Sequence, residues 1–249
     1  MRKILVLTVA FAVLGTMVAL FYIHSYYPIP VVTIPKFNHA PAQSKKTIPS
    51  ASSTSTAVTV PNSLLLPVPM TAQAPTGNWD QLHNEACEEA NAIMANAYFN
   101  LRQNLDPNYV ESQINLLTQW EDQNFGYHLD TTTAETAKMI EAVYGLKTKL
   151  IYNFTADDLK NALIHNQLAI ISENGRLLNN PYYKSPGPIH HMLLVKGYNS
   201  AGFITNDSGT KRGLNYFYDF DTLKTAAADW DHSQNTTDVS QKVAIIVWK

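Results

Sequence analysis

The hydrophobic pattern of this 249-residue chain changes its period partway through residues 62–249. Up to residue 145, apolar side chains recur at three- and four-residue spacing, which is typical of helices with one buried face. From residue 147 onward, short runs of β-branched and aromatic residues are separated by Gly, Asn and Pro, a pattern typical of strands and turns. Helices followed by strands favour an α+β fold class, with the N-terminal helices packed on an antiparallel sheet.

Local signals set the expected limits of these elements. Asp80 or Asn84 can cap a leading helix, whose apolar stripe extends from Ala90 to Leu101. Further helices are predicted to begin at Pro107, at a capping box in residues 132–135 and at Thr155, and the last two to end at Gly145 and near His165. The predicted strands are residues 147–152, 168–172, 191–198, 203–206, 215–218 and 243–248.

The first 27 residues have the composition of a transmembrane anchor. Arg2 and Lys3 precede an uncharged, largely apolar run at residues 4–23, and about 20 residues in a helix cross the roughly 30 Å hydrocarbon core of a bilayer. Because the basic residues precede the run, the positive-inside bias predicts that the rest of the chain lies outside the cell. A cleaved signal peptide is the alternative, but the run exceeds its usual ~7–15 residues and lacks a small-x-small site. We therefore predict a single-pass anchor in the cell membrane at residues 1–27.

Residues 28–61 differ from the segments on either side. They contain six prolines and a Ser/Thr-rich stretch at residues 50–56. Such a segment has too little apolar surface to offset the entropy lost on ordering, so it predicts a disordered linker. The remaining residues, 62–249, suit a single globular domain.

Charge and cysteine content exclude several classes of function. The chain has 18 Lys and Arg against 20 Asp and Glu, a net charge of −2, and so lacks the basic surplus of a nucleic-acid-binding protein. Its single cysteine rules out an intramolecular disulfide framework and a Cys-rich zinc site. We predict no cofactor and no metal.

Cys87, in the first turn of the predicted leading helix, is the candidate nucleophile. A helix N-terminus stabilises a thiolate, but a free cysteine is also a common small buried hydrophobe, so its position leaves both roles open. His191 opens the predicted strand 191–198, and Asp207 ends the next strand, where a hairpin would bring the two side chains together. Taken singly, His191 could belong to an exposed loop and Asp207 to a turn. Their order along the chain favours a thiol, its base and an orienting carboxylate. The position of Cys87 at a helix start and its proposed partner His191 predict a Cys87 pKa below ~8.5.

Four motifs carry a resemblance to a known family. They are residues 68–75 (VPMTAQAP), 86–94 (ACEEANAIM), 191–198 (HMLLVKGY) and 206–209 (NDSG). In this order they resemble the peptidase C39-like cysteine peptidases, which are papain-type folds related to the double-glycine leader peptidases of bacteriocin exporters. The resemblance covers residues 64–249 and implies a papain-like fold. Glu88 follows the cysteine where the exporter peptidases typically have glycine, and a carboxylate beside a thiol opposes its ionisation.

The resemblance implies roles for individual residues. Cys87 matches the nucleophile, His191 the general base and then acid, and Asp207 the carboxylate that orients the histidine through its Nδ1–H. The resemblance also implies an upstream glutamine that donates a hydrogen bond to the oxyanion. Gln73 fits the family's Pro-x-x-x-Gln pattern, and we assign the role to it. Gln81, six residues before the cysteine, fits the spacing in papain-like enzymes generally and is the alternative.

The predicted function is a membrane-anchored, extracytoplasmic bacterial cysteine peptidase that hydrolyses peptide or amide bonds through a thioester. Its expected partners are a peptide or protein substrate and the membrane. Two alternatives keep the triad but change the reaction: a cell-wall peptide hydrolase and a transglutaminase-like acyl transferase. A third alternative, of another class, is an inactive papain-like binding domain tethered to the membrane. The exporters' double-glycine specificity is not transferred, because no Walker A pattern or further membrane span accompanies the motifs.

Overall fold

The computed structural model describes residues 60–249, which form an α+β fold with an antiparallel sheet, as predicted. The strands of the main sheet are β1 (Leu64–Leu65), β2 (Lys147–Tyr152), β3 (Leu168–Glu173), β4 (His191–Tyr198), β5 (Gly202–Asp207), β6 (Tyr216–Asp219) and β9 (Val243–Trp248). Their spatial order is β2-β9-β3-β4-β5-β6, and β1 pairs with β4. Because β3 and β4 occupy the middle of the sheet, every residue of both strands is buried.

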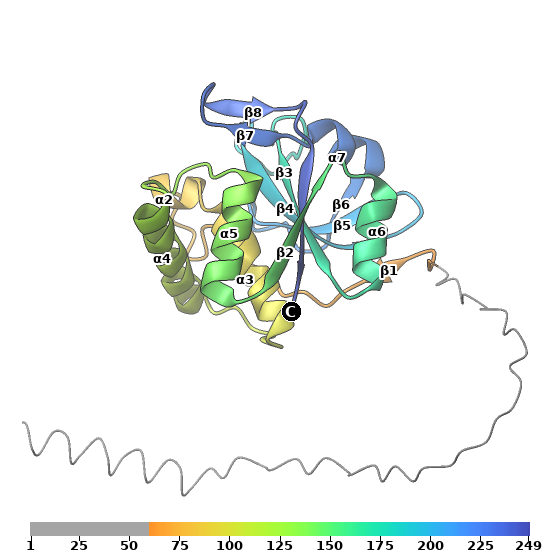
Figure 1. The fold of residues 1–249 in the computed structure, drawn as a ribbon, viewed down its shortest axis with the longest axis horizontal. Coiled ribbons are helices and arrows are strands. Elements are labelled where there is room, and N and C mark those ends of the chain that lie inside the picture. The colour runs from red at the N-terminus through yellow and green to blue at the C-terminus, as the bar shows by residue number, and fades with distance from the viewer. Residues whose placement is uncertain (1–59) are drawn as a thin grey trace, which may run out of the picture. The chain divides into compact units, whose positions relative to one another are not determined.

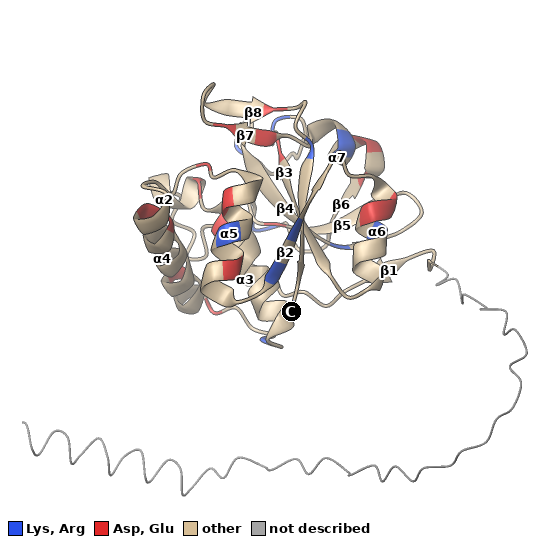
Figure 2. Ribbon diagram, in the orientation of Figure 1, with Lys and Arg blue, Asp and Glu red and all other residues tan. Residues whose placement is uncertain are grey.

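Helices cover both faces of this sheet. They are α2 (Gln81–Asn84), α3 (Cys87–Phe99), α4 (Pro107–Asn124), α5 (Thr133–Tyr144), α6 (Ala156–Ile164) and α7 (Phe220–Ala226). In Figure 1, α2 to α5 gather on one side of the sheet, and α6 and α7 lie on the other. Charged residues of both signs are spread along helices such as α5, in keeping with the small net charge (Figure 2).

The helix limits follow the predicted capping signals closely. The Thr132 hydroxyl accepts the backbone N–H of Glu135 while the Glu135 carboxylate accepts that of Thr132, and Gly145 ends α5 in the left-handed conformation. An equivalent pair formed by Thr155 and Asp158 begins α6. These reciprocal bonds satisfy backbone N–H groups that the first helical turn leaves without partners.

The leading helix differs from the prediction. Asp80 caps only the short helix α2, by accepting the backbone N–H of His83, and the chain then breaks before α3 begins at Cys87. Ala86 occupies the N-cap of α3, and its side chain cannot accept a hydrogen bond from the N–H groups of the first helical turn. At the other end, Leu101 lies beyond α3 with a positive φ and is exposed, so the apolar stripe ends before it. Cys87 is therefore in the first turn of its helix, as predicted, but that helix begins later than the predicted caps placed it.

The last third of the domain contains elements that the sequence did not predict. Helix α7 follows β6 directly, and β7 (Asp229–Asp231) pairs with β8 (Thr236–Asp238) as a separate two-stranded ribbon. Both strands of the ribbon have three residues, which is too short for an alternating hydrophobic pattern to be visible.

The predicted anchor at residues 1–27 and nearly all of the predicted linker at 28–61 lie outside the described residues. Among the helices of residues 60–249, none combines the length and apolar composition needed to span a bilayer.

Candidate active site

Cys87 is the first residue of α3 and its side chain is buried. The backbone N–H groups of the first helical turn and the positive end of the helix dipole both favour an anion at this position. The start of α3 therefore supplies one feature that lowers the pKa of a cysteine.

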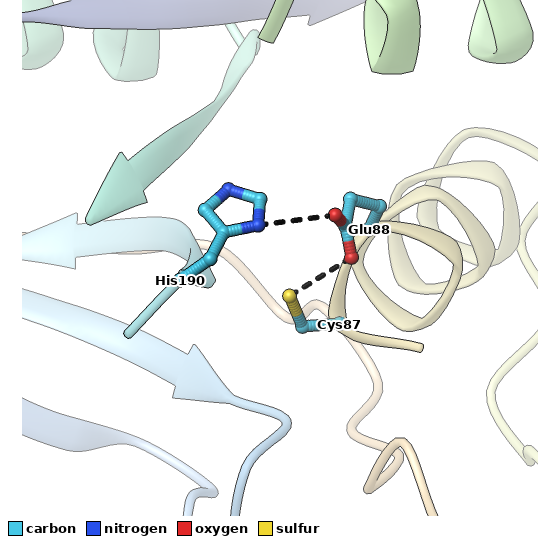
Figure 3. A group of neighbouring side chains, drawn as sticks. All are labelled: Cys87, Glu88 and His190. Carbon is cyan, nitrogen blue, oxygen red and sulfur yellow. Dashed lines mark hydrogen bonds and ion pairs between the residues drawn. The ribbon is translucent and has the colours of Figure 1, made fainter. Parts of the chain in front are cut away.

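The thiol contacts a carboxylate, as Figure 3 shows. Cys87 Sγ donates a hydrogen bond to Glu88 Oε2 at 2.9 Å. The other oxygen, Glu88 Oε1, accepts the backbone N–H of Thr131 at 3.0 Å and lies 3.3 Å from His190 Nδ1. His190, which the sequence did not single out, is buried, and its Nε2 contacts the Ser172 hydroxyl at 3.0 Å.

This environment raises the pKa of the thiol instead of lowering it. Burial is the largest cause, followed by the charge of Glu88 and the hydrogen bond to it, so the Cys87 pKa lies well above its usual range. The sequence-based expectation of a pKa below ~8.5 is therefore wrong for this conformation. Burial also raises the pKa of Glu88 to about 8, against the opposing charge of His190. Burial would lower the pKa of His190, but the bond to Asp130 and the charge of Glu88 raise it overall.

The structure brings His191 and Asp207 together at the start of β4 and the end of β5. His191 Nε2 lies 3.0 Å from Asp207 Oδ1, and both side chains are buried. The predicted contact used the other ring nitrogen, Nδ1. With Nε2 facing the carboxylate, Nδ1 is the atom left to face a thiol. Within residues 60–249 no hydrogen bond links that nitrogen to Cys87, whose acceptor is Glu88.

Asp207 is held by more donors than a turn residue needs. Its Oδ1 accepts the backbone N–H of Gly209 as well as facing the histidine, so the turn role and the orienting role coexist. Its Oδ2 accepts three side-chain donors, from Asn180 at 2.8 Å and from Tyr183 and Tyr218 at 2.7 Å each. Burial opposes ionisation of Asp207, but the charge of His191 and these hydrogen bonds outweigh it and lower the pKa.

The predicted oxyanion donor, Gln73, makes structural hydrogen bonds. Its Nε2 donates to the backbone carbonyls of His83 at 3.0 Å and Asn84 at 2.8 Å, while its Oε1 accepts the Ser208 hydroxyl at 3.4 Å. Both amide hydrogens are thus directed at the end of α2, and Gln73 links that helix to the residue after Asp207. The alternative, Gln81, is exposed at the start of α2.

Asn91, which the sequence did not single out, links the two halves of the site. Its Nδ2 donates to the backbone carbonyls of Cys87 and of Met192, each at 2.8 Å. One amide group therefore bridges the start of α3 and the start of β4. This contact holds the backbone of the cysteine beside that of the residue following His191.

Three of these side chains could ligate a metal. The ligand atoms of Cys87, Glu88 and His190 lie within 4.8 Å of one another, and thiolate, carboxylate and imidazole are all zinc ligands. Both oxygens of Glu88 already have partners in the protein, however. The arrangement is therefore explained by the hydrogen bonds within the cluster.

Comparison with known proteins identifies a family. A family model described as the Peptidase_C39 like family matches residues 65–238. No curated protein sequence matches the chain. Among solved structures, a protein described as a C39-like peptidase from Bacillus anthracis is 14% identical, with a TM-score of 0.49; the match covers 75% of this chain and 98% of that one.

Proposed function

The chain belongs to the Peptidase C39-like family, and on that premise we propose that it is a cysteine peptidase that hydrolyses peptide bonds with Cys87 as its nucleophile. The observation that carries this proposal is the buried contact of His191 with Asp207, at the strand end that Asn91 ties to the start of the cysteine helix. A thiol nucleophile, an imidazole that acts as its base and a carboxylate that orients the imidazole together can carry out acyl transfer.

Each residue has a defined step in this proposal. Sγ of Cys87 attacks the carbonyl carbon of the scissile bond, and its proton passes to Nδ1 of His191. Asp207, held at Nε2, stabilises the imidazolium and keeps the ring in the required orientation. The imidazolium then protonates the leaving amine, and water hydrolyses the thioester with His191 acting again as base.

The oxyanion of the intermediate requires donors close to the thiol. The backbone N–H of Cys87, at the start of α3, is one suitable donor. A glutamine side chain would be the second. Since the amide hydrogens of Gln73 already bind two carbonyl groups, the hydrogen bonding in this conformation supports Gln81 over Gln73.

The proposal includes a location. The basic residues before the apolar run at residues 4–23 support a single-pass anchor with the peptidase domain outside the cytoplasm. A peptidase placed there would act on peptides or proteins at the outer face of the membrane.

The test is cleavage of a degenerate peptide library, with the products identified by mass spectrometry. The wild-type protein should release new N-termini, whereas Cys87→Ser and His191→Gln should each release none above background. Lys149→Gln, on β2 and away from these side chains, is the control and should cleave like wild type. Products that persist in Cys87→Ser would exclude Cys87 as the nucleophile. If the folded wild-type protein and the Lys149→Gln control also release no products, the inactive binding domain is favoured.

A further inference from the structure

We propose that Glu88 is a positioning residue that holds the Cys87 thiol protonated and away from His191 in the resting protein. The inference rests on the proposed function for the identity of the nucleophile. The contacts of Glu88 are the same whether or not Cys87 is the nucleophile.

Three separate parts of the fold fix the carboxylate of Glu88. The residue belongs to α3, its Oε1 accepts the backbone N–H of Thr131 in the loop before α5, and the same oxygen faces His190 just before β4. Its side chain is only 1% exposed. With Oε1 held in this way, Oε2 is directed at the thiol, which donates to it at 2.9 Å.

A carboxylate in this position opposes ionisation of the thiol by two routes. Because the pKa of Glu88 is about 8 and that of the thiol is well above its usual range, Glu88 ionises before the thiol as the pH rises. An ionised Glu88 has only acceptor atoms, so it can bind the S–H group but has no hydrogen to offer a thiolate. Ionisation would also place two negative charges side by side in a buried site. The titratable groups around the thiol are Glu85, Glu88, Glu89, Asp130, His190 and His191. Burial and the charge of Glu88 are the largest causes of the raised thiol pKa.

The direction of the S–H group has a consequence for the reaction. In the described conformation the proton points to Glu88, so proton transfer to His191 first requires Sγ to leave the carboxylate. A rotation of the Cys87 side chain would break one hydrogen bond, and the proton would then pass from Sγ to Nδ1 of His191. The resting protein is therefore a thiol, and the reactive imidazolium–thiolate pair forms only after this contact opens.

The experiment measures the rate of Cys87 alkylation by iodoacetamide against pH in the full-length protein. Because Cys87 is the only cysteine, all label reports on it. Glu88→Gln keeps the shape of the side chain and the acceptor for Thr131, but replaces Oε2 by an N–H donor. We expect its thiol pKa to fall by at least one unit and its alkylation rate at pH 9, where Glu88 of the wild type is ionised, to rise about tenfold.

Glu89→Gln is the matched control. Glu89 is the next residue of the same helix and is equally buried, and its charge affects the thiol less than that of Glu88. Glu89 makes no hydrogen bond to Cys87, so Glu89→Gln should lower the thiol pKa by less than Glu88→Gln does. An unchanged thiol pKa in folded Glu88→Gln, or an equal shift in both variants, would overturn the proposal.

A second measurement needs no variant. Infrared absorption of the single S–H group in the wild-type protein at pH 7 should give a band shifted to lower frequency by its hydrogen bond, and Cys87→Ser should remove it. Absence of an S–H band at this pH would mean a resting thiolate and would overturn the proposal. Neither readout requires peptide cleavage, so an inactive protein with the predicted thiol behaviour would refute only the proposed function.

Discussion

Asp207 combines more contacts than any other residue of the candidate site. The prediction that it lies beside His191 is confirmed, because a hairpin of two adjacent strands fixes which ends meet. The donors from Asn180, Tyr183 and Tyr218 were not predictable from local pattern, since they come from a long loop and from β6. Glu88 was recognised only as an unfavourable neighbour of the thiol. Its binding to Thr131 and His190 depends on packing between distant segments.

Asp207→Asn should lower both turnover and stability. The amide group would face either the three donors at Oδ2 or the histidine and Gly209 at Oδ1, and each buried donor left unpaired costs about 1–3 kcal/mol. Loss of the charge that stabilises the imidazolium should reduce turnover by on the order of 10²-fold or more. Activity is measured at a temperature where the variant remains folded.

Tyr218→Phe separates these two effects. It removes one donor to Oδ2 but leaves the contact with His191, so it should cost about 1 kcal/mol of stability with turnover near that of wild type. Wild-type turnover in Asp207→Asn would mean that another residue orients the histidine.

Substitution of the two glutamines tests the oxyanion donor. Loss of one such donor costs on the order of 10²–10³ in turnover. Gln81→Ala should show this loss with little change in stability, because the residue is exposed. Gln73→Ala should chiefly lower the melting temperature, since it leaves the carbonyls of His83 and Asn84 without their donor. A large loss of turnover in Gln73→Ala, with turnover near wild type in Gln81→Ala, would instead assign the oxyanion donor to Gln73.

At the scale of elements, helix limits were predictable wherever a capping residue determines them. The boxes at Thr132 and Thr155 and the left-handed Gly145 act through neighbours within a few residues, so the sequence alone specifies α5 and α6. The start of α3 was not predictable, because Ala86 gives no capping signal and the break depends on Gln73 binding the carbonyls at the end of α2. The start of α3, the helix that carries the proposed nucleophile, is thus set by a tertiary contact.

The packing of α3 on α4 predicts a pH-dependent stability. Glu89 and Glu121 are buried, and among residues 60–249 no group outside this pair donates a hydrogen bond to their oxygens. Burial raises the pKa of Glu89 to about 7, although a hydrogen bond with Glu121 opposes this. Burial, followed by the charge of Glu89, raises the pKa of Glu121 to about 12. The two carboxyl groups therefore hold protons more tightly in the folded protein than in the unfolded chain.

Glu89→Gln tests this pair. The raised pKa means that Glu89 contributes stability that is fully present below its ordinary value of 4.5 and is lost as the pH rises toward about 7. A glutamine stays neutral and can donate to Glu121, so the melting temperature of the variant relative to wild type should increase from pH 5 to pH 7 and then stay level. Thermal unfolding followed by circular dichroism provides the measurement. A difference independent of pH would contradict a titrating Glu89.

At the scale of the whole molecule, the sequence predicts an α+β domain and a membrane anchor at residues 1–27, which lie outside the described range. The α+β class of residues 60–249 was predictable because the hydrophobic period itself changes along the chain. The ribbon of β7 and β8 was not, since three-residue strands have no readable period. The anchor prediction depends on composition and on the charge before the apolar run.

Protease accessibility tests the proposed topology. Trypsin added to intact cells should remove residues 60–249 from the membrane fraction, because the domain is proposed to lie outside. A cytoplasmic protein in the same cells serves as the control for lysis. Cleavage that occurs only after the cells are opened would reverse the orientation.

The central claim is that Cys87 attacks a peptide carbonyl and carries the acyl group. The most direct measurement is mass spectrometry of the intact protein, quenched with acid milliseconds to seconds after mixing with a peptide that it cleaves. We predict a mass increase equal to the N-terminal part of that peptide, located on Cys87 by fragmentation and absent in Cys87→Ser. Rapid cleavage with no acyl group on this residue at any quench time, or an acyl group on another residue, would contradict the account.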